Sequence, residues 1–290
     1  MDAPPDKEDC APFIDISARL LKAGIRAPEV LAFDAEQGFL LLPDFGNHLL
    51  LPALNAASVE RHYTDALNEL AHIQKVSTHG LGHYDIARLG IELDLFPEWF
   101  LQRHLGLQTA QAITPVWRHT RALLIASALD QPQCFVHRDF HSRNLMLDTA
   151  TPNGQLGVID FQDAVHGPVT YDAVSLLRDC YIEWPAHDVA RWRERFRVQS
   201  EQTLGLTLPA AQFAQQFDWM GVQRHLKVLG IFARLNYRDG KSRYLADLPL
   251  VLRYTLNVCR EYPALQPFAK WLSEVASARE ITAPRDLMLT

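Results

Sequence analysis

The chain has 290 residues, of which 48% are hydrophobic and 21% are charged, and its net charge is −6 at pH 7. This is an ordinary globular composition, and its acidic balance disfavours a nucleic-acid-binding protein, which normally carries a basic domain. No stretch approaches the roughly 20 apolar residues of a membrane span, and the acidic, proline-rich start is unlike a signal peptide. The four cysteines are far apart and form no CxxC pair, which indicates reduced thiols in a cytoplasmic protein. We expect a monomer with neither nucleic-acid nor membrane partners.

The beginning of the chain predicts a small segment of mixed structure. Apolar residues at helical spacing predict a helix over residues 9–23, which Gly24 would end. Two strands are expected over residues 29–33 and 39–42, joined by a turn at Gly38. A breaker sequence then follows at residues 43–46. We place a domain boundary there, between residues 1–46 and residues 47–290.

The rest of the chain predicts a larger, mostly helical domain with a strand-rich centre. Amphipathic helices are expected over residues 58–76, 96–104 and 114–129, the second of which would begin near Pro97. Helices resume after Tyr171. Short β-like runs occupy three stretches in between, at residues 134–137, 145–147 and 157–160. The sequence therefore predicts the α+β class.

The strand-rich centre carries polar residues in an order that is typical of a catalytic site. One strand leads to Asp139 in a tight loop, Asn144 follows where the next strand begins, and a third strand ends in Asp160. Antiparallel pairing of the last two strands would bring Asn144 and Asp160 together. Their oxygens suit Mg²⁺, which takes hard oxygen ligands and few protein groups. Asp139 could orient an attacking hydroxyl and accept its proton, as phosphoryl transfer requires.

This motif resembles the catalytic loop and the metal-binding aspartate of kinase-like enzymes. The residues that carry the resemblance are His137, Arg138, Asp139 and Asn144, followed by Ile159, Asp160 and Phe161. His141 is typical of the aminoglycoside and choline phosphotransferases. The segment after Asp160 is too short for a protein-kinase activation segment, and it has no Ala-Pro-Glu motif.

The resemblance implies a protein-kinase-like bilobal fold and an enzyme that uses ATP and Mg²⁺. Residues 1–46 would be the remnant of a truncated, nucleotide-binding amino-terminal lobe, and residues 47–290 would form a mostly helical lobe for catalysis and substrate binding. Asp139 would be the catalytic residue, and Asn144 and Asp160 would be the metal ligands. Asp172 is expected to be a buried carboxylate that braces the loop. His137 is expected to pack in the core and hold the loop in place.

The resemblance to kinases is incomplete at the front of the chain. No G-x-G-x-x-G motif occurs, and Lys7 follows two prolines and cannot lie on a central strand. We expect that Met1 is an internal start and that the glycine-rich loop and its lysine lie upstream; a reduced chain with weak nucleotide affinity is the alternative. The adenine is expected to lie against the backbone of four residues, Leu41, Leu42, Pro43 and Asp44.

Two other classes of function fit parts of the motif. His137, Asp139 and His141 could be ligands of a metallohydrolase, but such a site needs several more ligands, and His166 is the one nearby candidate. Bound zinc would favour that class, and magnesium-dependent ATP turnover would exclude it. A non-catalytic binding module on a kinase fold is the other possibility, and the intact catalytic motif argues against it.

The expected acceptor comes from a narrower resemblance. The catalytic loop, residues 159–164, residues 92–100 and residues 223–227 look like the bacterial anomeric kinases for N-acetylmuramate and N-acetylglucosamine. This implies phosphorylation of the anomeric (C1) hydroxyl of a small sugar in cell-wall recycling. Fold and core motif do not fix the acceptor, so an aminoglycoside or another small alcohol is the alternative.

The candidate acceptor-binding residues are charged or polar side chains: Glu92, Asp94, Gln162, Arg224 and Lys227. For the acids, the alternative is enrichment at a helix amino-terminus, where the helix dipole favours them. Arg224 and Lys227 lie on one face of an apolar helix, and buried charges need partners. A ligand carboxylate, such as the lactyl group of N-acetylmuramate, is one possible partner. An internal acid such as Asp172, or solvent, is the other.

Overall fold

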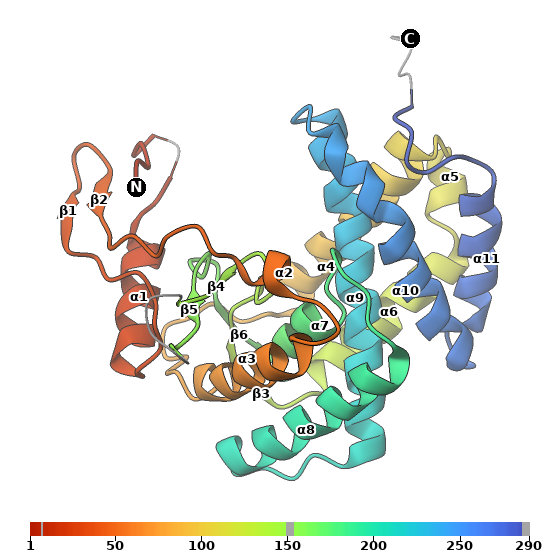
Figure 1. Ribbon diagram of the computed structural model, residues 1–290. Coiled ribbons are helices and arrows are strands. Elements are labelled where there is room, and N and C mark those ends of the chain that lie inside the picture. Colours follow the sequence, from red (N-terminus) through yellow and green to blue (C-terminus); the bar gives the residue numbers. More distant parts are fainter. Residues whose placement is uncertain (7, 149–153, 286–290) are drawn as a thin grey trace. The chain divides into compact units, whose positions relative to one another are not determined.

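The computed structural model describes residues 1–6, 8–148 and 154–285. This part of the chain is α+β, with helices that predominate and short antiparallel sheets (Figure 1). The chain forms two compact units. The first contains residues Met1–His83, Pro132–Asp179 and Trp184–Phe213, and the second contains Tyr84–Gln131, Cys180–Glu183 and the described chain from Ala214 onward. Each unit combines segments that are far apart in the sequence. The domain boundary after Gly46 remains a prediction.

The first unit contains all of the described strands. Its elements are α1 (Ala11–Lys22), β1 (Ala32–Asp34), β2 (Phe39–Leu41), α2 (Leu50–Ala53), α3 (Val59–Ile73), β3 (Gln133–Val136), β4 (Leu145–Met146), β5 (Gly157–Val158), β6 (Val165–Pro168), α7 (Tyr171–Leu177) and α8 (Ala186–Leu204). The predicted first helix, the hairpin and the helix over residues 58–76 are confirmed, with slightly shorter bounds.

Helix α1 connects the start of the chain to the strand-rich centre. Its apolar residues repeat at helical spacing, and Gly24 ends it with a φ of 80°, a conformation that glycine adopts without strain. The buried ring of Phe13 lies 4.8 Å from the ring of Phe161, measured between centroids. Since Phe161 directly follows Asp160, this aromatic contact fixes the segment that carries the expected metal ligand.

Two small antiparallel sheets frame the loop that carries Asp139. Strand β4 pairs with β5, with Leu145 opposite Val158, which is the pairing expected from the sequence. Strand β3 pairs with β6, with Val136 opposite Val165. Strand β6 was not predicted, because its sequence, Val-His-Gly-Pro, contains two turn-forming residues.

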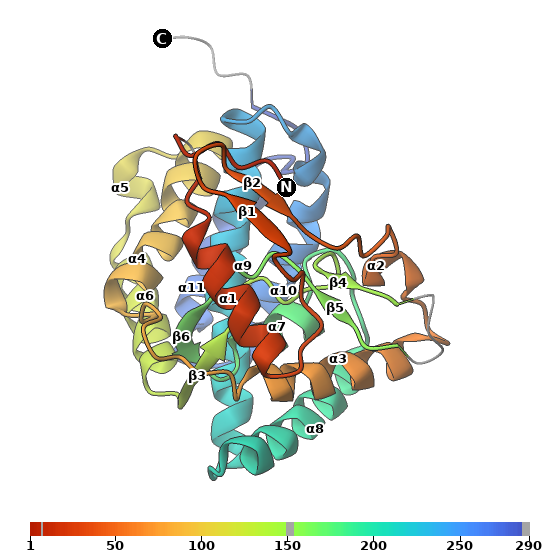
Figure 2. The ribbon, with the colours of Figure 1, turned by 90° about the vertical axis from the view of Figure 1, so that its left-hand side faces the viewer.

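Helices α3 and α8 lie side by side and cover one side of the first unit (Figure 1 and Figure 2). Tyr63 of α3 packs edge-on against Trp192 of α8, with 4.8 Å between ring centroids. The Tyr63 hydroxyl donates a hydrogen bond to the carbonyl of Leu176 at the end of α7. The buried aromatic pair therefore also fixes α7, the helix on which Asp172 lies.

The second unit is helical. Its elements are α4 (Ile86–Leu95), η1 (Phe96–His104), α5 (Thr109–Ala112), α6 (Pro115–Leu129), the larger part of α9 (Ala210–Tyr237), η2 (Ser242–Asp247), α10 (Leu248–Glu261) and α11 (Gln266–Ser277). The predicted helices over residues 96–104 and 114–129 are confirmed, the former with π-helical hydrogen bonds. Within the described residues, no helix is both long and apolar enough to cross a membrane.

The core of the second unit is aromatic and closely packed. Phe96 contacts both Trp117 and Phe268, at centroid distances of 5.1 and 6.2 Å. Helix α9 approaches Leu95 so closely that a Cβ on Gly230 would lie 2.4 Å from the Leu95 carbonyl carbon. A larger residue at position 230 would therefore push the two helices apart.

Candidate active site

The loop between β3 and β4 is held at its start by a buried carboxylate. Asp172, in the first turn of α7, accepts hydrogen bonds from the backbone N–H groups of His137 at 2.7 Å and of Arg138 at 3.0 Å. Only 3% of its surface is exposed. Hydrogen bonds to an ionised acceptor in a water-poor site are among the strong ones, so Asp172 fixes the backbone that leads into Asp139.

A second buried carboxylate holds the far end of the same loop. Asp179 accepts hydrogen bonds from the backbone N–H of Ser142 at 3.0 Å and from its hydroxyl at 2.5 Å. Asp179 was not predicted from the sequence. Ser142 and Asp179 are 37 positions apart, and the local signal was an acidic residue two positions after an apolar helical run.

His137 is fully buried beneath the loop, and its contacts define its protonation state. The backbone N–H of Asp139 donates to Nδ1 at 3.2 Å, so the proton of the neutral ring is on Nε2, which lies 3.1 Å from the carbonyl oxygen of Ile159. Burial lowers the pKa of His137 to about 4, although the nearby carboxylates of Asp139 and Asp160 act in the opposite direction. The ring therefore connects the catalytic loop to the strand before Asp160 in its neutral form.

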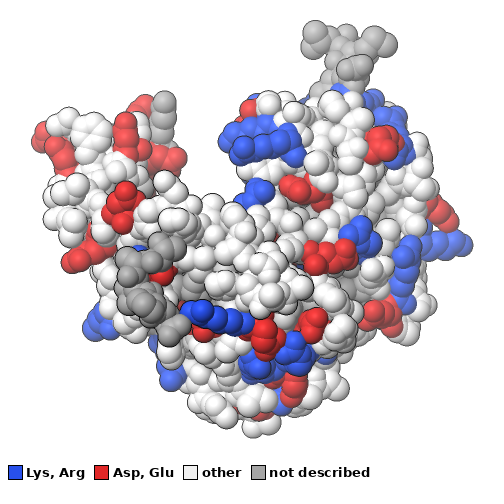
Figure 3. Space-filling view, in the orientation of Figure 1, with Lys and Arg blue, Asp and Glu red and all other residues white. Residues whose placement is uncertain are grey.

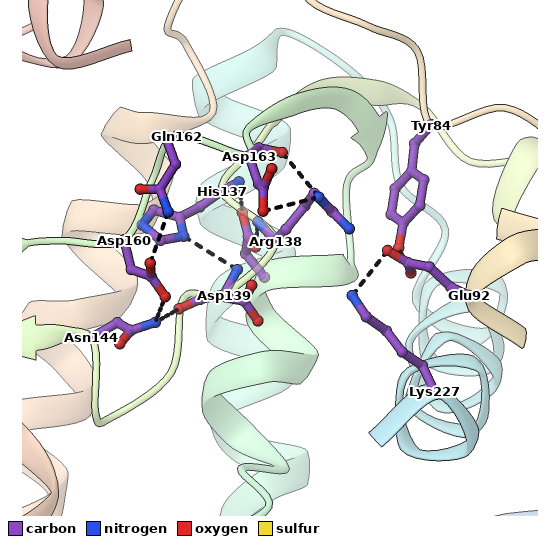
Figure 4. Close-up of polar contacts among 11 residues, drawn as sticks. Tyr84, Glu92, His137, Arg138, Asp139, Asn144, Asp160, Gln162, Asp163 and Lys227 are labelled. Atoms are coloured by element: carbon purple, nitrogen blue, oxygen red, sulfur yellow. Dashed lines mark hydrogen bonds and ion pairs between the residues drawn. The ribbon is translucent and has the colours of Figure 1, made fainter. Parts of the chain in front are cut away.

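Asn144, Asp160 and Gln162 form a hydrogen-bonded group (Figure 4). The Asn144 amide nitrogen donates to Oδ2 of Asp160 at 3.1 Å and to the carbonyl oxygen of Asp139 at 3.0 Å. The Gln162 amide nitrogen donates to Oδ1 of Asp160 at 3.0 Å. The side chain of Asp139 points away from this group, while its carbonyl faces Asn144. The carboxylate of Asp160 is thus oriented from two sides.

The donor set of this group fits Mg²⁺. Asp160 offers a carboxylate and Asn144 a side-chain carbonyl oxygen, and their side chains are already within hydrogen-bond distance of each other. Mg²⁺ takes oxygen ligands of this kind, commonly with few protein groups and with the remaining positions filled by water and phosphate oxygens. Among the residues that the structure describes, no group of three or more His, Cys, Asp or Glu side chains is placed to hold a metal ion.

Two residues of the site have an unusual backbone conformation. Arg138 has a φ of 77° and Asp160 a φ of 64°, and within the described residues no other non-glycine residue has a positive φ. Residues other than glycine rarely adopt this left-handed backbone region, because their Cβ atom then crowds the backbone. Strained residues of this kind concentrate at functional sites.

A cavity of about 460 Å³ lies beside Asn144 and Asp160. It is lined by Met1, Asp2, Ala3, Glu8, Asp9, Cys10, Phe13, Asn144, Ile159, Asp160 and Gln162. Acidic side chains gather over the hairpin and the start of the chain, as Figure 3 shows. The lining does not include residues 41–44, so contact of the adenine with that segment remains a prediction.

The expected acceptor-binding residues other than Gln162 lie in the second unit. Lys227 of α9 lies 2.9 Å from Oε1 of Glu92 on α4, and both side chains are buried. The hydroxyl of Tyr84 donates to the same carboxylate. The internal partner of Lys227 is therefore Glu92, whereas Asp172 holds the loop in the first unit.

The alternative explanation for Glu92 and Asp94, enrichment at a helix amino-terminus, is wrong. Glu92 and Asp94 lie toward the carboxyl end of α4, a helix that was not predicted from the sequence. Asp94 is exposed and forms a paired salt bridge with Arg121, at 2.9 and 3.0 Å. Arg224 is buried on α9. Whether any of these residues binds a sugar remains a prediction.

Comparison with known proteins gives consistent matches. The model of a phosphotransferase enzyme family matches residues 1–211. The curated N-acetylmuramate/N-acetylglucosamine kinase of Pseudomonas aeruginosa is 44% identical over 283 residues, which are 97% of this chain and 82% of that protein. The kinase of the same name from Neisseria meningitidis serogroup B is 42% identical over 288 residues, 97% of this chain and 84% of that protein.

A solved structure supports the fold. An ethanolamine kinase of Plasmodium vivax matches 88% of this chain and 74% of its own, with a TM-score of 0.62 and 12% identity. At this identity the likeness concerns the fold alone, and it confirms the kinase-like α+β fold expected from the sequence.

Proposed function

Because the chain belongs to the phosphotransferase enzyme family, we propose that it transfers the terminal phosphoryl group of ATP to the anomeric hydroxyl of N-acetylmuramate and N-acetylglucosamine. The choice of acceptor is supported by the sequence identity of 42–44%, over nearly the whole chain, to curated kinases of these two sugars. The product would be a sugar 1-phosphate, which a nucleotidyltransferase reaction can consume. We propose that the chain acts in the cytoplasm, where ATP is available, and that it is a monomer.

Asp139 would be the residue that acts on the acceptor. Its backbone is held by His137, and the loop on either side is held by Asp172 and Asp179. A carboxylate in this position can accept a hydrogen bond from the sugar hydroxyl, orient it toward the phosphorus atom and take up its proton as the new bond forms. Such positioning, together with charge neutralisation, is most of what phosphoryl transfer needs.

Asn144 and Asp160 would hold Mg²⁺ beside the nucleotide phosphates. When bound there, Mg²⁺ would neutralise charge on the phosphate oxygens. The two residues would supply oxygen ligands, and the Gln162 amide would keep the carboxylate of Asp160 in place. The cavity beside them is also lined by Asp2, Glu8 and Asp9, so a polyanionic nucleotide would be repelled there without a cation.

The remaining contacts belong to the nucleotide base and the acceptor. The base would lie against the backbone of residues 41–44. Glu92, Asp94, Gln162 and Arg224 would contribute to acceptor binding. Lys227 would act through Glu92, because the two side chains form a buried ion pair. Arg224 is the cation that we assign to the lactyl carboxylate of N-acetylmuramate.

The test is ADP release by the purified chain with ATP, Mg²⁺ and one acceptor at a time. The acceptors are N-acetylmuramate, N-acetylglucosamine, ethanolamine and kanamycin. We expect ADP release that depends on either amino sugar and on Mg²⁺. Turnover of kanamycin or ethanolamine but of neither sugar would contradict the acceptor and leave the kinase assignment intact. ATP turnover supported by zinc but not by magnesium would contradict the metal assignment.

A further inference from the structure

Arg138 occupies a backbone position that suits glycine better than arginine. Its φ of 77° lies in the left-handed region, where a Cβ is crowded and a glycine is not. The conformation is imposed by the loop, because Asp172 accepts hydrogen bonds from the N–H groups of both His137 and Arg138. A glycine could make the same backbone contacts without strain. The arginine side chain must therefore contribute something that compensates for the strained backbone.

The guanidinium group of Arg138 extends to the turn that follows Asp160. Its Nη1 lies 3.4 Å from the backbone carbonyl oxygen of Asp163 and 3.6 Å from Oδ2 of the same residue (Figure 4). The Arg138 side chain is only 16% exposed, whereas that of Asp163 is 68% exposed. This contact is long and one partner is exposed, so by itself it adds little to stability; its position between two segments of the site is the feature that matters.

The contact joins the two strained segments of the site. Arg138 directly precedes Asp139, and Asp163 lies three residues after Asp160, the other residue with a positive φ. A side chain that bridges these segments restricts how far Asp160 can move relative to the loop that carries Asp139. Small displacements of reacting groups cost large factors in rate, so such a link has a catalytic effect even where its effect on stability is small.

We propose that Arg138 is a positioning residue that holds the turn over residues 160–164 against the catalytic loop, and thereby fixes Asp160 relative to Asp139. The catalytic part of this proposal rests on the proposed function, whereas the positioning of the turn does not. Arg138 itself would touch neither the nucleotide nor the sugar. Its loss should therefore change the mobility of the turn and kcat, with little change in the KM for the sugar.

Hydrogen–deuterium exchange of the whole chain measures the positioning directly. The variants are Arg138→Gly, which removes the strain and the side chain, and Arg138→Met, which keeps a Cβ and loses the charge. We expect faster exchange at the amides of residues 160–164 in both variants and unchanged exchange in α8, with the Tm of Arg138→Gly equal to or above that of the wild type. Unchanged exchange of the turn in both variants would refute the proposal, whatever the activity.

A double-mutant cycle with Asp163→Ala measures the coupling. We expect kcat to fall about tenfold in Arg138→Gly and about threefold in Asp163→Ala, and the double variant to be no slower than Arg138→Gly, because both changes break one link. Partial recovery in Arg138→Lys would support a role of the charge. Independent, multiplicative losses would refute the link. A wild-type chain inactive on both sugars would contradict the proposed function, and the exchange experiment would still decide on the role of Arg138.

Discussion

The side-chain amide of Asn144 lies 3.1 Å from Oδ2 of Asp160, although 16 positions separate the two residues. The pairing of β4 with β5 brings them together, since Asn144 precedes the first of these strands and Asp160 follows the second. In the same group, the Asn144 amide also holds the carbonyl of Asp139. One asparagine thus connects the expected metal ligand to the expected catalytic residue.

Removal of the Asp160 charge should abolish magnesium-dependent turnover. The Asp160→Asn variant keeps the size of the side chain but loses the anionic oxygens, so we expect kcat to fall by about a thousandfold or more. The activity should be measured as ADP release across a magnesium titration, with Asp65→Asn, an exposed residue of α3, as the matched control. Near-normal turnover of Asp160→Asn at saturating magnesium would show that Asp160 is not the metal ligand.

The buried ion pair between Glu92 and Lys227 should stabilise the second unit more than the exposed pair between Asp94 and Arg121. The Lys227→Met variant leaves the Glu92 carboxylate buried without its cation, and we expect the free energy of unfolding to fall by about 3 kcal/mol. Asp94→Asn is the control, with an expected loss of less than about 1 kcal/mol. Urea denaturation followed by circular dichroism provides both values.

The double variant Glu92→Gln/Lys227→Met separates pairing from packing. If the two charges stabilise each other, its loss of unfolding free energy should be smaller than the sum of the two single losses. A Lys227→Met variant as stable as the wild type, with a raised KM for the sugars, would instead assign Lys227 to the acceptor.

His137 should make the fold sensitive to acid. Its pKa is lowered to about 4 in the folded chain by burial, against about 6.5 when unfolded, so the unfolded chain binds more protons between these values. The contribution of the neutral His137 ring to the free energy of unfolding is complete above about pH 6.5. It is lost as the pH falls toward 4, and the loss reaches about 3 kcal/mol. Urea denaturation between pH 4 and pH 7, as a function of pH, measures this loss.

Two histidine variants test whether His137 causes the sensitivity of the fold to acid. His137→Gln should flatten the dependence of the unfolding free energy on pH, because it removes the buried imidazole. His119→Gln, at an exposed position, is the matched control and should keep the wild-type slope. Equal slopes in the wild type and in His137→Gln would contradict the assignment to His137.

Arg224 should distinguish the two sugars. N-acetylmuramate carries a lactyl carboxylate that N-acetylglucosamine lacks, and a buried arginine is a suitable partner for it. We expect Arg224→Ala to raise the KM for N-acetylmuramate at least about tenfold more than the KM for N-acetylglucosamine. Arg118→Ala, on the exposed side of α6, is the control. An equal rise for both sugars would indicate that Arg224 has a structural role.

The local part of the site was predictable from the sequence, because strand pairing and turn residues determine it. The strands around Asn144 and Asp160 carry apolar runs bounded by polar turns, and their antiparallel pairing follows from the short connection. The polar residues that these strands place side by side were therefore identified without the structure.

The non-local part was not predictable. Asp179 accepts a hydrogen bond from Ser142, which is 37 positions away in the sequence. Lys227 pairs with Glu92, which is 135 positions away. Helix α4 was not predicted because Gly90, a poor helix former, interrupts its apolar pattern, and β6 was not predicted because it contains Gly-Pro. In each case the partner is selected by tertiary packing, on which a local pattern carries no information. The left-handed backbone conformation of Arg138 was likewise not predictable from the sequence, because an arginine does not indicate a positive φ.

The most direct measurement is phosphorus NMR of a mixture of the chain, ATP, Mg²⁺ and N-acetylmuramate, compared with the same mixture containing Asp139→Asn. The wild type should produce a new sugar 1-phosphate signal together with ADP. In Asp139→Asn the signal should form more slowly by about three orders of magnitude or more, with the ATP affinity little changed, since only the positioning of the hydroxyl and its proton acceptor are lost. A wild-type mixture without a sugar phosphate, or an Asp139→Asn variant that forms it at the wild-type rate, would contradict the proposed kinase mechanism.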